Sequence, residues 1–230
     1  MTTRRQIKEL AAPLLARHAD LALVKNTIVI RPVNHLLSFI LIERTGNADV
    51  FDPRWTTTIL IQGMADIPIG EARRLYRGGA GRRWAWSDAT MIQSFVEIVE
   101  NEVLPQLRAV RTLQDYVDMV LSRVPDDPYS RWAPAMLCSL ALGDLDQAQA
   151  LLEQNPRLHG TDMGSLYVKV LNRLDKDLGT RLLERGGRLE RADRLKLAEH
   201  LHELEELSVK NLGLEKIWVR TEFPIESLDV

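Results

Sequence analysis

The hydrophobic period of this 230-residue chain changes about half-way along its length, and this change limits the possible folds more than any other feature. Runs rich in Ile, Val, Thr and Trp stand at 27–31, 36–44 and 55–62. Such runs are typical of β-strands, and the short polar connections between them favour an antiparallel meander. From Leu113 onward, apolar residues instead recur every three or four positions, as on a helix face. The pattern predicts an α+β fold, with a small antiparallel sheet and flanking helices in the N-terminal half and an all-α C-terminal half.

Helices are expected before and after the predicted strands in the sequence. Apolar residues at helical spacing over 7–15 predict a first helix, which Pro13 is expected to kink or break. A short last strand is expected at 83–86, with its two tryptophans on one face. The apolar stripe that begins at Met91 predicts a strong amphipathic helix that ends near residue 104 or one turn later.

The chain is expected to divide into an α+β domain at residues 1–110 and a helical domain at 111–230. A segment with two prolines, 124–128, interrupts the helical pattern. The charge also differs along the chain, because residues 1–125 hold 16 Lys+Arg and 13 Asp+Glu, whereas the rest holds 14 and 19. The last segment, 217–225, is extended in character and is expected to form either an added strand or a tail docked over the helices.

Two segments of the helical half repeat each other. Residues 144–154 and 175–185 both read Asp-x-Asp, then a small residue, then Leu-Leu-Glu, at an offset of 31 residues. Each follows a segment with helical period, which predicts two helix-turn-helix units over 129–187. Units of this kind bury their apolar faces by stacking on one another.

These units resemble tetratricopeptide repeats. Trp132, Gly143 with Asp144, and Ala148 fall where that family keeps its aromatic start, its turn and its small packing residue. The resemblance implies paired helices that offer a groove to a partner segment.

The first 100 or so residues are similar to uncharacterised bacterial α+β domains of the DUF4304 type. The similarity rests on a helix, three strands, the stretch Arg83–Trp86, and a helix that runs to Leu107. It implies no catalytic residues. Some domains of this type occur near toxin-immunity loci, so an immunity or accessory role is one expectation.

Five arginines are the most conspicuous candidate site. They lie within eleven residues, together with three glycines, and are Arg73, Arg74, Arg77, Arg82 and Arg83. Arginines bind carboxylates and phosphates through paired hydrogen bonds, and glycines let backbone amides approach an anion. The spacing is not that of a P-loop. The segment is interpreted first as a solvated loop, and binding of an acidic protein or a nucleic acid is the alternative.

Other polar residues are interpreted as structural. Cys138 is expected to be a small buried hydrophobe. His200 and His202 lie in the charged stretch 199–206, and because they are two residues apart they point to opposite sides of a helix. This stretch is therefore expected to form a charged solvent face and no metal site. The glutamates between 97 and 102 are interpreted as an exposed helix face, and no catalytic residue or cofactor is predicted.

The function that the sequence favours is that of a non-enzymatic bacterial module that binds another protein. The alternatives are an enzyme or ligand-binding protein with a cleft between its halves, and a nucleic-acid-associated protein that uses the arginines. The net charge of -2 supplies no general attraction to nucleic acid or to membranes. The chain shows neither a signal-peptide pattern nor the run of about 20 consecutive apolar residues that a transmembrane helix needs. We therefore expect a cytoplasmic protein that does not bind a membrane.

Overall fold

The computed structural model describes residues 2–70, 72–77, 83–122, 129–153 and 190–228. The chain forms two compact units. Unit 1 comprises Met1–Thr58, Ile67–Val110 and Gly213–Val219, and unit 2 comprises Ile59–Asp66, Arg111–Leu212 and Arg220–Val230. Residues 59–66 and 213–219 thus lie on the other side of the division that the sequence predicts at residue 110.

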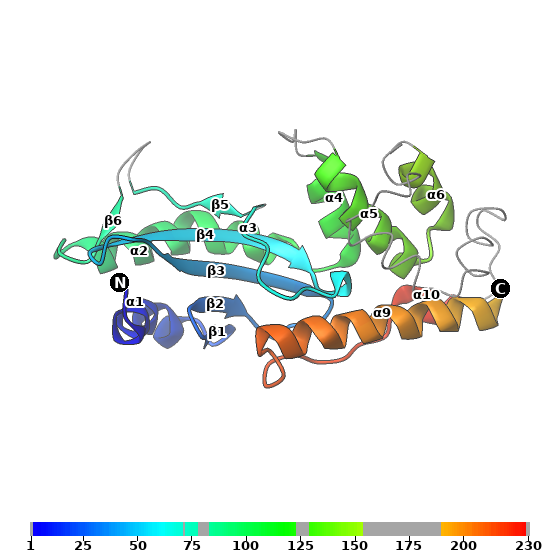
Figure 1. Cartoon of the computed structure of the whole chain (residues 1–230), viewed down its shortest axis with the longest axis horizontal. Coiled ribbons are helices and arrows are strands. Elements are labelled where there is room, and N and C mark those ends of the chain that lie inside the picture. Colours follow the sequence, from blue (N-terminus) through cyan, green and yellow to red (C-terminus); the bar gives the residue numbers. More distant parts are fainter. Residues whose placement is uncertain (1, 71, 78–82, 123–128, 154–189, 229–230) are drawn as a thin grey trace. The chain divides into compact units, whose positions relative to one another are not determined.

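Unit 1 contains a six-stranded sheet, which confirms the predicted α+β class (Figure 1). Its strands are β1 (Leu21–Val24), β2 (Thr27–Ile30), β3 (Leu36–Arg44), β4 (Val50–Ile59), β5 (Arg73–Arg74) and β6 (Trp84–Ala85). The strand order is β1-β2-β3-β4-β5, and β6 pairs with β4 as well. The pairs β1–β2, β2–β3, β4–β5 and β4–β6 are all antiparallel.

Two strands differ from the sequence prediction. β4 begins five residues earlier than expected and passes through Pro53, and it ends at Ile59, where a 3-10 turn, η1 (Leu60–Gln62), follows. β1 was not predicted, because Leu21–Val24 has no clear alternation of apolar and polar residues. It forms a hairpin with β2 across Lys25, whose φ of 56° lies in the left-handed region.

Helices pack on one face of the sheet in unit 1. They are α1 (Arg4–Arg17), α2 (Met91–Ile98), the π-helical turn η2 (Val99–Val103) and α3 (Leu104–Ala109). Their buried residues share one core with Ile28, Ile40 and Phe51 from the strands. α1 continues through Pro13 without the predicted break.

Unit 2 consists of helices, as the sequence predicts for the C-terminal half. They are α4 (Leu113–Ser122), α5 (Tyr129–Leu142), α6 (Leu145–Glu153), α9 (Arg191–Leu212) and α10 (Pro224–Ser227), together with η1. α5 and α6 form one helical hairpin, whose turn contains Gly143 with a φ of 81°. The second predicted hairpin lies outside the described residues, so the resemblance to tetratricopeptide repeats stays a prediction.

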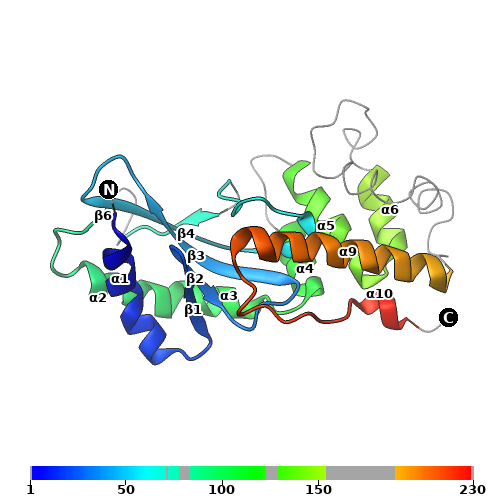
Figure 2. The same cartoon turned by 60° about the horizontal axis from the view of Figure 1, so that its bottom comes forward.

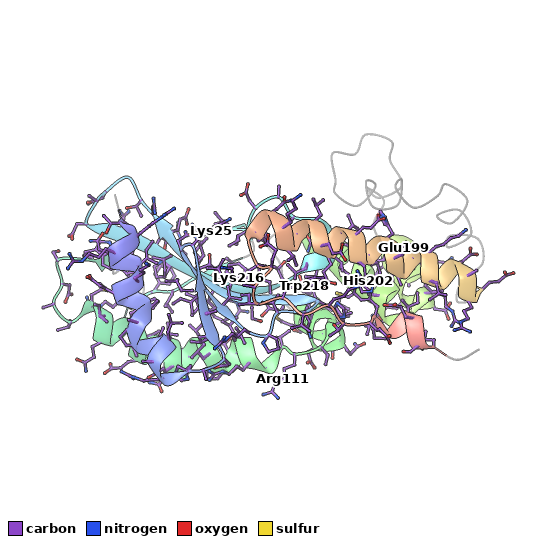
Figure 3. The ribbon with its side chains drawn as sticks, turned by 90° about the horizontal axis from the view of Figure 1, so that it is seen from below. Lys25, Arg111, Glu199, His202, Lys216 and Trp218 are labelled. Atoms are coloured by element: carbon purple, nitrogen blue, oxygen red, sulfur yellow. The ribbon has the colours of Figure 1, made fainter. Side chains whose placement is uncertain are left out.

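The C-terminal segment belongs first to unit 1, at Gly213–Val219, and then to unit 2, from Arg220 onward. In unit 1, Trp218, which is labelled in Figure 3, forms a parallel bridge to Val33. Of the two expected forms of this segment, an added strand or a docked tail, the strand is thus reduced to a single pair. In unit 2, the chain then forms the short helix α10, which packs on α9 (Figure 2). No helix within the described ranges is long and apolar enough to cross a membrane.

Candidate functional site

One border of the sheet in unit 1 is built from two short strands instead of one. β5 lies opposite Arg54 and Trp55 of β4, and β6 lies opposite Val50 and Phe51. Because β3 occupies the other side of β4, β5 and β6 form an outer border of the sheet (Figure 1). Of the arginines that the sequence singles out, Arg73 and Arg74 form β5, and Arg83 directly precedes β6.

The register of β5 determines which of its backbone groups point out of the sheet. The Leu75 N–H donates to the Pro53 carbonyl at 2.8 Å. Arg74, one residue earlier, pairs with Arg54. In an antiparallel ladder, hydrogen-bonded pairs alternate with pairs that exchange no hydrogen bond. The backbone N–H and C=O of Arg74 therefore point away from β4.

A proline in β4 explains how β5 and β6 are tied together. A residue at position 53 with an N–H would donate to the Leu75 carbonyl, but Pro53 has none. The indole Nε1 of Trp84 donates to that carbonyl instead, at 2.7 Å. Trp84 is buried among Phe51 and Phe95, with ring centroids 6.1 and 5.5 Å away. This side chain thus replaces a missing ladder bond.

Strand alternation separates Arg73 from Arg74. Adjacent residues of a strand point to opposite faces of the sheet. On the helix side, the Arg73 guanidinium carbon lies 5.4 Å from the centroid of the Trp55 ring, and its Nη1 donates to Gln106 at 3.3 Å. On the opposite face, Arg74 Nε lies 3.0 Å from a carboxylate oxygen of Asp52. The two arginines of β5 therefore do not lie on one face of the sheet.

Arg74 belongs to a charge network on the face away from the helices. Asp52 also pairs with Arg54 at 3.2 Å, and Arg54 lies 2.8 Å from Glu43 without hydrogen-bond alignment. Two arginines and two carboxylates make this network neutral. The Arg74 side chain is 51% exposed, and exposed ion pairs contribute only about 0–1 kcal/mol, so Asp52 holds Arg74 weakly.

The other arginines differ in how they are held. Arg77 pairs with Asp88, donates to Thr90 at 2.6 Å and lowers the pKa of the Asp88 carboxyl through this hydrogen bond. Arg82 lies outside the described residues. Arg83 is exposed and has no ion pair or hydrogen bond to any residue that the structure describes.

We use the name arginine edge for four exposed residues along β5 and β6. They are Arg73, Arg74, Tyr76 and Arg83. Tyr76 is 51% exposed and was not singled out by the sequence, because a lone tyrosine in a polar stretch carries no local signal. Tyrosine and arginine are enriched among the residues that contribute most to protein–protein binding.

A cluster on α9 shows where the sequence interpretation is wrong. His202 and Glu205 were expected on a charged solvent face, but they are 4% and 0% exposed. His202 is labelled in Figure 3. Its Nε2 lies 2.9 Å from Glu226 of α10, and its ring packs on Phe223 with centroids 4.4 Å apart. The difference arises because a segment about twenty residues later folds back on the helix.

A second cluster joins α1 to the π-helical turn η2. Glu100 lies 2.9 Å from His18 Nε2 and 2.9 Å from Arg17 Nη1. Beside it, Arg108 donates to both carboxylate oxygens of Asp20, at 2.9 and 2.8 Å. Glu100 was expected on an exposed helix face, yet both of its carboxylate oxygens are paired, so the cluster is best explained as a clamp between α1 and η2.

The sites for other chemistry are limited. Cys138 is buried, and burial raises the pKa of its thiol, which agrees with a packing role. Across the described ranges, no group of three or more His, Cys, Asp or Glu residues could hold a metal ion.

Comparisons with known proteins add no relative. No protein-family model, no curated protein and no solved structure matches this chain. The similarities to tetratricopeptide repeats and to DUF4304-type domains therefore rest on the sequence motifs alone.

Proposed function

We propose that this chain is a non-enzymatic module that binds another protein through the arginine edge. The observation that carries the proposal is the exposure of Tyr76 beside Arg74 on an open sheet border. A half-exposed aromatic ring next to weakly held guanidinium groups matches the composition of binding hot spots, where aromatic and arginine side chains dominate.

An acidic protein surface suits this edge better than a nucleic acid does. Nucleic-acid binding depends on several arginines or lysines that contact successive phosphates. Of the described arginines, Arg77 is held by Asp88, and Arg73 is stacked on Trp55 and points to the other face from Arg74. A protein partner can contact both faces of a strand border, because its own side chains alternate as well.

Photo-crosslinking inside the producing cell tests the proposal. Benzoylphenylalanine is placed at Tyr76 and, as a matched control, at the exposed Lys8 of α1. We expect a crosslinked species from position 76 that position 8 does not yield, and that the charge reversal Arg74→Glu reduces several-fold. Equal yields at both positions, or a yield that does not respond to Arg74→Glu, would contradict the proposal.

A further inference from the structure

We infer that the β5 border receives an acidic, extended segment of the partner as an additional strand of the sheet, an inference that rests on the proposed function. Strand addition couples main-chain hydrogen bonds with side-chain pairing on alternate positions. The border supplies both elements. Its backbone groups point outward at Arg74, and its exposed side chains carry excess positive charge.

The backbone of β5 is available for pairing. The N–H and C=O of Arg74 face away from β4, as the register shows. Neither group is hydrogen-bonded to another residue in the described part of the chain. On β6, the Trp86 N–H donates to Asp49 at 2.8 Å, so the same alternation turns the backbone groups of Ala85 outward. Unpaired groups on an edge strand are a template for another strand.

The opposite border of the sheet is less available. Beside β1, the Arg31 N–H donates to the Asp20 carbonyl at 2.7 Å. By the same alternation, the backbone N–H and C=O groups of Leu21 and Leu23 point away from β2. The Leu21 N–H, however, already donates to the His18 carbonyl at 3.1 Å. The side chains of β1 are also uncharged, so this border lacks a signal for an acidic segment.

The charges on the β5 border favour acidic side chains. The network of Glu43, Arg54, Asp52 and Arg74 is neutral, whereas Arg73 and Arg83 have no carboxylate partner within the described residues. Directly opposed residues of neighbouring strands lie about 4.5–5.5 Å apart, close enough for opposite charges to attract. Glutamates at alternate positions of an added strand would thus face Arg74 and Tyr76 on one side, and residues between them would face Arg73.

A second copy of this chain is a poorer occupant. If two β5 strands paired with each other, Arg73 and Arg74 of one copy would lie against the same arginines of the other. Like charges opposite one another destabilise a strand pair. Charge therefore selects a different, acidic chain.

The backbone contribution can be separated from the charge by comparing Arg74→Pro with Arg74→Ala. Both variants remove the guanidinium group, but only proline also removes the outward N–H. Because Arg74 exchanges no hydrogen bond with β4, proline at an edge position of this kind leaves the ladder intact. Extended backbone at Arg73, the preceding residue, is also compatible with proline. Unchanged circular dichroism and melting temperature would verify folding of both variants.

The probe is a fluorescein-labelled decapeptide that alternates glutamate with valine and threonine, and its binding to the full chain is followed by fluorescence anisotropy. For Arg74→Ala we expect about a two- to fivefold loss of affinity, as for an exposed ion pair. For Arg74→Pro we expect a further loss of about tenfold, because a main-chain hydrogen bond is removed as well. A probe with N-methyl groups on alternate amides should also bind about tenfold more weakly, which tests the backbone without changing the protein.

The outcomes separate this inference from the proposed function. If Arg74→Pro and Arg74→Ala bind equally, and N-methylation has no effect, strand addition is wrong, although crosslinking at Tyr76 can still support a protein partner. If a lysine version of the probe or a ten-base DNA strand binds as tightly as the acidic probe, the acidic partner is wrong. A concentration-dependent dimer that Arg74→Pro abolishes would assign the border to a second copy and overturn the inference.

Discussion

We expect the chain to lose stability when the hydrogen bond from Trp84 to the Leu75 carbonyl is removed. Trp84→Phe keeps an aromatic ring beside Phe51 and Phe95 but removes the indole N–H, which donates at 2.7 Å. Leu75 is 5% exposed, so water cannot readily replace the donor. A buried acceptor left without a partner costs about 1–3 kcal/mol, and the smaller ring adds a packing loss. We therefore expect a loss of about 2–4 kcal/mol in unfolding free energy.

A second substitution tests the physical reason for this loss. Pro53→Val restores an N–H at the position opposite Leu75, which can then donate to the same carbonyl. In the Pro53→Val background, Trp84→Phe should therefore cost less than in the native chain, by about 1 kcal/mol or more. Trp86→Phe is the control, because its indole donates to the Thr2 hydroxyl, and its cost should not depend on residue 53.

Equilibrium urea unfolding of the four chains of the cycle, followed by circular dichroism, measures these differences. The interaction free energy is the difference between the cost of Trp84→Phe in the two backgrounds. A value within about 0.5 kcal/mol of zero would refute the reasoning, because distant and independent substitutions add to within this range. A cost below about 1 kcal/mol for Trp84→Phe alone would show that the carbonyl is not stranded.

Three further predictions concern local features of the two units. Lys25→Gly should raise the unfolding free energy, measured by urea titration, by up to about 1 kcal/mol, because glycine adopts the φ of 56° without strain. The greater chain entropy of glycine in the unfolded state offsets part of this gain. A destabilised variant would contradict the prediction. The N–H groups of Arg111 and Thr112 hold the pKa of Asp115 below its usual range, so its stabilising effect is complete above pH of about 4 and is lost as the pH falls further. Asp115→Asn should accordingly flatten the acid side of the stability profile, and an unchanged acid limb would disprove this role. Phe223→Ala should cost about 3–5 kcal/mol and speed amide exchange in α10, whereas Val219→Ala, at a half-exposed site, should do neither; equal exchange in the two variants would refute the packing role.

The elements with local signals were predicted from the sequence. The helical stripe of Leu113, Tyr116 and Val117 is buried on α4, and the apolar runs at 27–31 and 36–44 became β2 and β3. Cys138 is buried, as its apolar surroundings predict. Each of these predictions needs only the spacing of apolar residues within a window of one element, so it does not depend on distant partners.

Other features depend on residues far apart in the chain. Leu60–Gln62 looked like the end of a strand, but in unit 2 the Leu60 carbonyl accepts from Ser208 at 2.6 Å, and the Met64 N–H donates to the same hydroxyl at 2.7 Å. His202 is buried because Phe223 and Glu226 return to α9. No local pattern reports such contacts.

The arginine edge shows the same division between sequence and tertiary structure. The clustering of the five arginines and their excess of charge were evident from the sequence. Which of them share a face of the sheet was decided only by strand pairing, because the register of β5 on β4 sends Arg73 and Arg74 to opposite faces and turns the backbone of Arg74 outward. The reason is physical: composition sets the charge of a segment, whereas the direction of each side chain and backbone group is set by a partner strand twenty residues away.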